Sequence, residues 1–222
     1  QLLSTRFNSV VSAHRVFDTR RFGVEEFDAI RTLVPGASIN DAVLAVCGGA
    51  LRKHLQAIGE LPESSLTAVT PLNPRRHAGD ESRSFTWLRV QLGTELDDPV
   101  RRLALIHEQT AAALGPDAAP HAADSGDGSH QAAASLAISS RMQSLLSLGS
   151  ARMTYFSAIM PIADGMGLVF AVTSYDGRII ISPTSCRELL PDPEAFTQQL
   201  RDSFQEYLAL ARAKPARKPR SA

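Results

Sequence analysis

The sequence has 222 residues, of which 44% are hydrophobic, enough to bury the core of one large domain or two small ones. It carries 23 Lys and Arg against 23 Asp and Glu, and this balance excludes a global field that would favour nucleic acid or an anionic membrane. No apolar run approaches the roughly 20 residues that a membrane-spanning helix needs, and no signal peptide is recognisable. We therefore expect a folded α/β protein that does not bind nucleic acid.

The two cysteines, Cys47 and Cys186, lie far apart in the sequence. They lack the paired spacing of a zinc site or of a disulfide framework, so we expect no metal and a reducing, cytoplasmic setting. The chain begins at Gln1 without an initiator methionine, and we expect that further residues precede it.

The clearest helix is predicted over residues 38–58. Ser38 can cap the free amides of the first turn, and Asp41 stands at the capping-box position three residues on. Apolar residues then recur at helical spacing up to Gly59, the expected stop. Short strands are predicted at 66–71 and 85–92, followed by a helix that opens at Asp98-Pro99.

Residues 115–130 are rich in Gly, Pro, Ala, Asp and Ser, which predicts a loop or linker. A helical pattern resumes over 131–149, and strands are predicted at 153–159, 167–175 and 178–183. Asp176-Gly177 indicates a type I′ hairpin turn between the last two. A helix opens at Asp192-Pro193, and a basic tail covers 214–222.

Helices that alternate with strands indicate an α/β fold in which helices pack on a mixed sheet. We expect one domain over residues 1–213, with the 115–130 loop inside it and the 214–222 tail loose beyond it. Contact of this tail with anionic lipid is the alternative to a solvated tail.

Several segments, in this order, resemble the bacterial wax ester synthase/diacylglycerol acyltransferase family. The Ser-Ile-Asn-Asp-Ala-Val-Leu-Ala stretch at 38–45 is similar to the family's Asn-Asp motif, and Pro71-Leu72-Asn73-Pro74-Arg75 to its Pro-x-x-x-Arg strand end. Weaker similarity covers residues 7–8, 14–15, 49–52, 61–62, 92–103, 167–168, 174–177 and 191–192. Taken in order, these segments resemble only the C-terminal half of the proteins in this family.

The resemblance implies a chloramphenicol-acetyltransferase-like half of a two-domain acyltransferase. It also implies that a His-His-x-x-x-Asp-Gly motif in an N-terminal half supplies the general base. None of the six histidines here lies in such a motif, so we expect no catalytic residue in this chain. His54 and His107 are expected on solvated helix faces, although a lone His can act if another chain completes its site.

A second departure from the family pattern falls at 148–153, where Leu-Gly-Ser-Ala-Arg-Met replaces the usual Ser-Asn-x-Pro-Gly-Pro turn. Either this protein has lost the turn, or residues are missing between the segments on the two sides of 148–153.

Three residues are candidates for substrate binding. Asn40 and Asp41 stand at a helix start, where capping is favoured over substrate contact, although an oxyanion is also stabilised there. Arg75 follows a strand and suits a phosphate or carboxylate, while the next arginine, Arg76, is expected in solvent.

Two functions follow. The first is an acyl-CoA-dependent O-acyltransferase that forms triacylglycerols or wax esters, with acyl-CoA as cosubstrate, a lipid alcohol as acceptor and no bound cofactor. Its partner is the N-terminal half of the same protein, on the same or a separate chain, and peripheral contact with membrane or lipid droplets fits its substrates. The alternative is a non-catalytic lipid-binding or assembly module with the same half-fold.

Overall fold

The computed structural model describes residues 5–72, 86–114, 134–138 and 146–214. Within these ranges a seven-stranded sheet has the order β1-β9-β8-β5-β3-β4, with β2 also paired to β9. β5 runs parallel to both neighbours and the other pairings are antiparallel, so the predicted mixed sheet is confirmed. The strands are β1 (Arg15–Phe17), β2 (Arg20–Gly23), β3 (Thr67–Leu72), β4 (Thr86–Gln91), β5 (Ala134–Ile138), β8 (Val169–Tyr175) and β9 (Arg178–Cys186).

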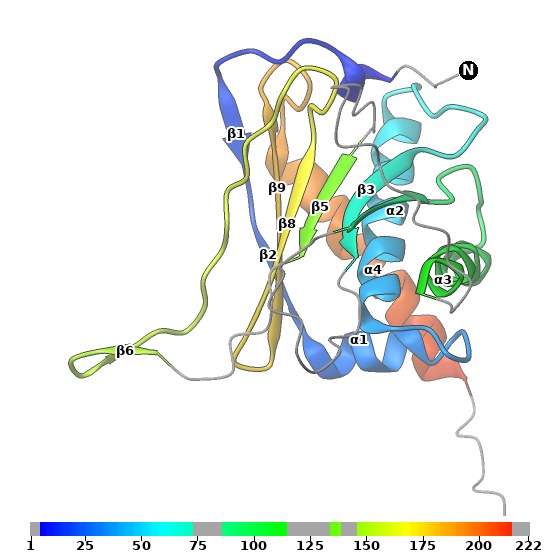
Figure 1. Cartoon of the computed structure of the whole chain (residues 1–222), viewed down its shortest axis with the longest axis vertical. Helices are drawn as coiled ribbons and strands as arrows, with labels where there is room; N and C mark the ends of the chain where they lie inside the picture. Colours follow the sequence, from blue (N-terminus) through cyan, green and yellow to red (C-terminus); the bar gives the residue numbers. More distant parts are fainter. Residues whose placement is uncertain (1–4, 73–85, 115–133, 139–145, 215–222) are drawn as a thin grey trace, which may run out of the picture.

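The described helices are α1 (Val24–Arg31), α2 (Ile39–Ala57), α3 (Pro99–Leu114) and α4 (Pro193–Ala213). Figure 1 shows α2 and α4 side by side against one face of the sheet. Ring centroids of Phe170 in β8 and Phe196 in α4 are 5.9 Å apart, and those of Phe22 and Phe204 are 4.5 Å apart. These contacts place the core between the sheet and the helices. Burial of each such side chain contributes about 1.5–3 kcal/mol to stability.

The predicted helix with its cap at Ser38 is confirmed as α2. The Ser38 hydroxyl accepts a hydrogen bond from the Asp41 amide at 3.1 Å, and the Asp41 carboxylate accepts one from the Ser38 amide at 2.8 Å. A Cβ atom on Gly49 would lie 2.2 Å from the Ser203 hydroxyl of α4. Glycine therefore allows α2 and α4 to approach closely at this point.

Other predicted elements are also confirmed. β3 and β4 correspond to the strands predicted at 66–71 and 85–92, and α3 to the helix opening at Asp98-Pro99. β8 and β9 form the expected hairpin, with positive φ at Asp176 (46°) and Gly177 (71°) as a type I′ turn requires. The Asp192 carboxylate caps α4 by accepting from the Ala195 amide at 2.9 Å.

The helix predicted over 131–149 is wrong. β5 lies inside the sheet between β3 and β8, while β6 (Ser147–Leu148) and β7 (Ala151–Arg152) form a separate two-stranded hairpin. Ala and Leu favour a helix locally, but this weak preference is overridden when a segment pairs on both sides. A strand in the interior of a sheet also lacks the alternation of apolar and polar residues by which a half-exposed strand is recognised in a sequence.

The strand predicted over 153–159 is wrong as well, because no strand is assigned there. Instead, side chains of β8 contact its backbone. The Thr173 hydroxyl donates to the Phe156 carbonyl at 2.9 Å, and the Tyr175 hydroxyl donates to the Met153 carbonyl at 3.2 Å. These hydroxyls satisfy carbonyl groups for which a neighbouring strand would otherwise be needed.

No helix or strand was predicted from the sequence before residue 38. A short 3-10 helix (Arg6–Asn8) precedes β1 and β2, which both pair with β9 at the sheet edge. The Gly23 amide donates to the Glu26 carboxylate at 3.0 Å, which caps α1. The predicted 115–130 loop and the tail beyond Lys214 lie outside the described residues, and the division into a 1–213 domain and a tail stays a prediction.

Candidate functional site

Asn40 and Asp41 occupy the first turn of α2, where the two side chains have different surroundings. Asn40 is exposed, whereas Asp41 is 2% exposed. Besides its bond to the Ser38 amide, the Asp41 carboxylate accepts a hydrogen bond from the Thr110 hydroxyl at 2.7 Å. It also lies 3.0 Å from the His107 Nδ1 atom. Asp41 therefore connects the start of α2 to α3.

His107 is thus a partner of Asp41, and the expectation that it lies on a solvated face is wrong. With the carboxylate at Nδ1, the neutral ring carries its proton there and leaves Nε2 as an acceptor. A Cβ atom on Gly36 would lie 3.1 Å from this Nε2 atom. The ring thus faces the loop before α2, which favours a positioning role over proton transfer to a substrate.

The same expectation for His54 is also wrong. Its side chain is buried between the rings of Phe7 and Phe196, with centroid distances of 6.4 and 5.2 Å. Nδ1 lies 3.2 Å from the Gln199 amide oxygen, and Nε2 has no partner among the described residues. Burial lowers the pKa of His54, so the ring is neutral at pH 7.

Arg75 lies outside the described residues, and its proposed contact with phosphate or carboxylate stays a prediction. In the part of the chain that the structure describes, no group of three His, Cys, Asp or Glu residues is arranged to hold a metal ion. Cys47 and Cys186 are buried free thiols, and burial raises the pKa of Cys47, which makes it an inert core residue.

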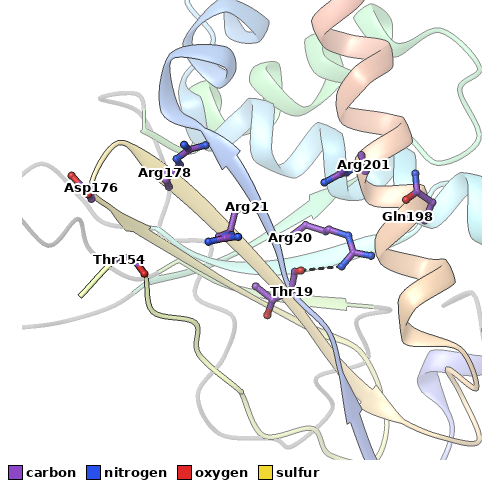
Figure 2. Close-up of a pocket in the computed structure, with 8 residues that line it drawn as sticks. All are labelled: Thr19, Arg20, Arg21, Thr154, Asp176, Arg178, Gln198 and Arg201. Atoms are coloured by element: carbon purple, nitrogen blue, oxygen red, sulfur yellow. Dashed lines mark hydrogen bonds between the residues drawn. The ribbon is translucent and has the colours of Figure 1, made fainter. Parts of the chain in front are cut away.

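A cavity of about 710 Å³ lies at the sheet edge formed by β2, close to the β8–β9 turn and α4. Figure 2 shows that arginines from three elements line it, with Arg201 extending from α4 toward the strands. The lining residues are Thr19, Arg20, Arg21, Thr154, Asp176, Arg178, Gln198 and Arg201. No motif in the sequence marks this site, because its residues come from separate stretches of the chain.

Two of these arginines are held in place by neighbours. Arg20 Nη1 donates to the Asp18 carboxylate at 2.8 Å and to the Thr19 carbonyl at 3.1 Å. The Arg21 guanidinium lies 4.7 Å from the ring centroid of Tyr155, a cation–π contact. Asp176, the acidic lining residue, is paired with Arg152 at 2.9 Å.

Comparisons with known proteins agree on one family. Residues 133–207 match the model of the WS/DGAT C-terminal domain. O-acyltransferase WSD of Acinetobacter baylyi is 29% identical over 86% of this chain and 47% of its own length. A Mycobacterium tuberculosis relative is 28% identical over 91% of this chain and 49% of its own length. The chain thus spans about half the length of the curated relatives it matches.

Solved structures give the same fold. The wax ester synthase/diacylglycerol acyltransferase from Marinobacter aquaeolei VT8 superposes with a TM-score of 0.78 at 20% identity, over 95% of this chain and 53% of that chain. The epimerization domain of tyrocidine synthetase B has a TM-score of 0.54 at 12% identity, over 91% and 50% of the respective chains. In sequence and fold, the chain is similar to the C-terminal half of the wax ester synthase/diacylglycerol acyltransferases.

Proposed function

We propose that this chain is the C-terminal half of an acyl-CoA-dependent O-acyltransferase that forms triacylglycerols or wax esters. One observation carries the proposal: nearly the whole chain aligns with about half of proteins named O-acyltransferase and wax ester synthase/diacylglycerol acyltransferase. Acyl-CoA is the cosubstrate and a lipid alcohol the acceptor, and no bound cofactor is needed.

The surroundings of the described histidines support a catalytic base on the N-terminal half. His54 is buried against the rings of Phe7 and Phe196, and the His107 Nδ1 atom lies against the Asp41 carboxylate. His14 is exposed beside Glu188, with Nδ1 3.2 Å from its carboxylate. A general base must reach the proton of the acceptor hydroxyl, and none of these rings lines the arginine-lined cavity.

A projecting arm supports the N-terminal half as the partner. Residues 146–160 form this arm: the β6–β7 hairpin projects at its outer end (Figure 1), while Met153 and Phe156 contact β8. Leu148 is 88% exposed and Ile159 is 56% exposed, and Tyr155 is exposed as well. Exposed apolar side chains grouped on one segment are typical of a surface that a partner covers. In our proposal, the N-terminal half covers this arm.

Across the described residues, no helix combines the length and the apolar character that crossing a membrane requires. We propose a cytoplasmic location, with peripheral contact at the inner membrane or at lipid inclusions, where lipid alcohols are available.

The decisive measurement is transfer of a radiolabelled palmitoyl group from its CoA thioester to hexadecanol and to dioleoylglycerol. We expect the complete protein, with its N-terminal half, to acylate at least one of these acceptors, and this chain alone to acylate neither. Activity of this chain alone would contradict the division of roles. Lack of transfer by the complete protein to either acceptor would favour the non-catalytic module.

A further inference from the structure

The arginine-lined cavity carries more positive charge than its neighbours neutralise. Four arginines and one aspartate line it, and that aspartate, Asp176, is already paired with Arg152. Asp18 offsets Arg20. Over the residues that the structure describes, Arg21, Arg178 and Arg201 take part in no ion pair. An anion that entered this space would meet three uncompensated guanidinium groups.

Protection of a sheet edge explains only part of this arrangement. Charged side chains on an edge strand discourage pairing with another chain, which accounts for Arg21 on β2. It does not account for Arg201, which belongs to α4 and is directed toward the same space (Figure 2). Three separate elements supply cations to one cavity, and this convergence is typical of a binding site.

The donor groups suit phosphate. A guanidinium presents paired N–H groups that bind phosphate oxygens in a bidentate manner, and the stacking of Arg21 on Tyr155 leaves the edge of its guanidinium available. The Thr154 hydroxyl adds a neutral donor, whereas the Gln198 amide is already bonded to Asp202 at 2.8 Å. A volume of about 710 Å³ exceeds what one phosphate group fills and lies in the range of ligand pockets.

We propose that this cavity binds a phosphate-bearing ligand through Arg21, Arg178 and Arg201. The shared chemistry is a phosphate ester, supplied either by a soluble nucleotide such as the adenosine bisphosphate end of CoA or by a phospholipid headgroup. The site goes beyond the proposed acyl transfer and does not depend on it, because its test is binding and not turnover.

The test uses the complete protein and two probes, of which one is a soluble nucleotide and the other a lipid vesicle. Calorimetry measures binding of adenosine 3′,5′-bisphosphate, and flotation measures binding to vesicles of phosphatidylglycerol in phosphatidylcholine, with pure phosphatidylcholine as the uncharged reference. The variant is Arg178→Gln with Arg201→Gln. The matched control is Arg101→Gln with Arg187→Gln, which removes the same charge from exposed positions outside the cavity. Circular dichroism verifies that both variants are folded.

We expect the Arg178/Arg201 variant to weaken binding of at least one probe by about tenfold or more, and the control to leave it within about twofold. Loss of bisphosphate binding identifies a soluble phosphate ester, and loss confined to vesicles identifies a lipid headgroup. The proposal is overturned if neither probe binds the wild-type protein. It is also overturned if both variants weaken binding equally, because binding then reflects only net charge.

Discussion

The carboxylate of Asp41 serves two helices at once. It accepts hydrogen bonds from the Ser38 amide and the Thr110 hydroxyl and lies beside the His107 ring, all within a nearly inaccessible environment. A buried acid with this many hydrogen-bond partners is fixed in position, because its lone pairs are already occupied. Its loss would affect the cap of α2 and the contact with α3 together.

We expect Asp41→Ala to lower the free energy of unfolding by about 2–3 kcal/mol. The lost cap costs about 0.5–2 kcal/mol, and the His107 Nδ1 atom is left facing no acceptor, while Thr110 keeps its bond to the His107 carbonyl. Urea denaturation of the complete protein measures the change.

Asn40→Ala is the matched control, because this neighbouring side chain is exposed and its loss should change stability by less than about 0.5 kcal/mol. An Asp41→Ala protein that is as stable as wild type yet cannot transfer acyl groups would show that Asp41 acts on the substrate. Reduced turnover of Asn40→Ala at unchanged stability would show the same for Asn40.

His54 makes stability depend on pH. Burial lowers its pKa below the unfolded value near 6.5, so the unfolded chain binds the proton more readily. The stability contributed by the neutral ring is fully present above about pH 6.5 and is lost as pH falls through the lower, folded pKa. We expect the free energy of unfolding to decline over this window, with a slope from this group of up to about 1.4 kcal/mol per pH unit.

The comparison is with His54→Gln, a polar residue that does not titrate, measured by denaturant unfolding at several pH values from 7.5 down to 5. The variant should show a shallower decline than wild type in this window. Equal slopes for the two proteins would mean that His54 does not carry the effect.

Only some of the contacts of Asp41 could be predicted from the sequence. The Ser-x-x-Asp spacing predicted the cap role of Asp41, because both partners lie within one turn. His107 and Thr110 could not be assigned to it, since they are 66 and 69 residues away on another helix. The partners of Arg102 could not be assigned from the sequence either. This residue is 2% exposed and donates to the Gly93 carbonyl at 3.0 Å and to the Tyr207 hydroxyl at 3.3 Å, and Tyr207 is 105 residues away.

Among the elements, α2 packs closely against α4 and against the residue that follows β4, and two of its glycines allow this packing. A Cβ atom on Gly48 would lie 2.6 Å from the Leu92 carbonyl oxygen, and one on Gly49 would lie 2.2 Å from the Ser203 hydroxyl. Ser203 in turn donates to the Val46 carbonyl at 3.0 Å. A pair of glycines inside a helix lowers its intrinsic stability, and the close packing against two neighbours offsets that loss.

We expect Gly49→Ala to destabilise the protein by about 1–3 kcal/mol, because the added methyl group has to displace the Ser203 side chain. In the double variant with Ser203→Ala, the clashing hydroxyl is gone and the nearest Ser203 atom, Cβ, would lie 3.3 Å from the new methyl. The two changes should therefore cost less together than the sum of the single variants in thermal unfolding. Strict additivity would show that the helices do not meet there as described.

Elements with strong local signals were predicted and others were not. Caps at Ser38 and Asp192 and the Asp176-Gly177 turn each involve neighbouring residues, so the sequence contains the whole interaction. β5 has no such signal, because its conformation comes from pairing with β3 and β8. The 153–159 segment was mistaken for a strand because its apolar residues are typical of one, whereas its Met153 and Phe156 carbonyls accept hydrogen bonds from side chains of β8 and form no ladder.

For the whole molecule, the family resemblance identified the half-fold, while the arginine-lined cavity became visible only in three dimensions. Its arginines come from β2, β9 and α4, and no sequence motif groups these three elements. The projecting arm was hidden for a different reason: an exposed apolar segment and a buried one have the same composition. Only the structure shows which of them lacks a covering layer.

The pairing of β1 and β2 with β9 also bears on how the chain is made. Residues 15–23 find their sheet partner only in residues 178–186, near the opposite end of the chain. During synthesis, β1 and β2 emerge from the ribosome long before β9 does. Such distant pairing slows folding, since a long loop has to close before any contact stabilises it. The sheet edge that carries Arg20 and Arg21 is thus completed only after β9 has been translated.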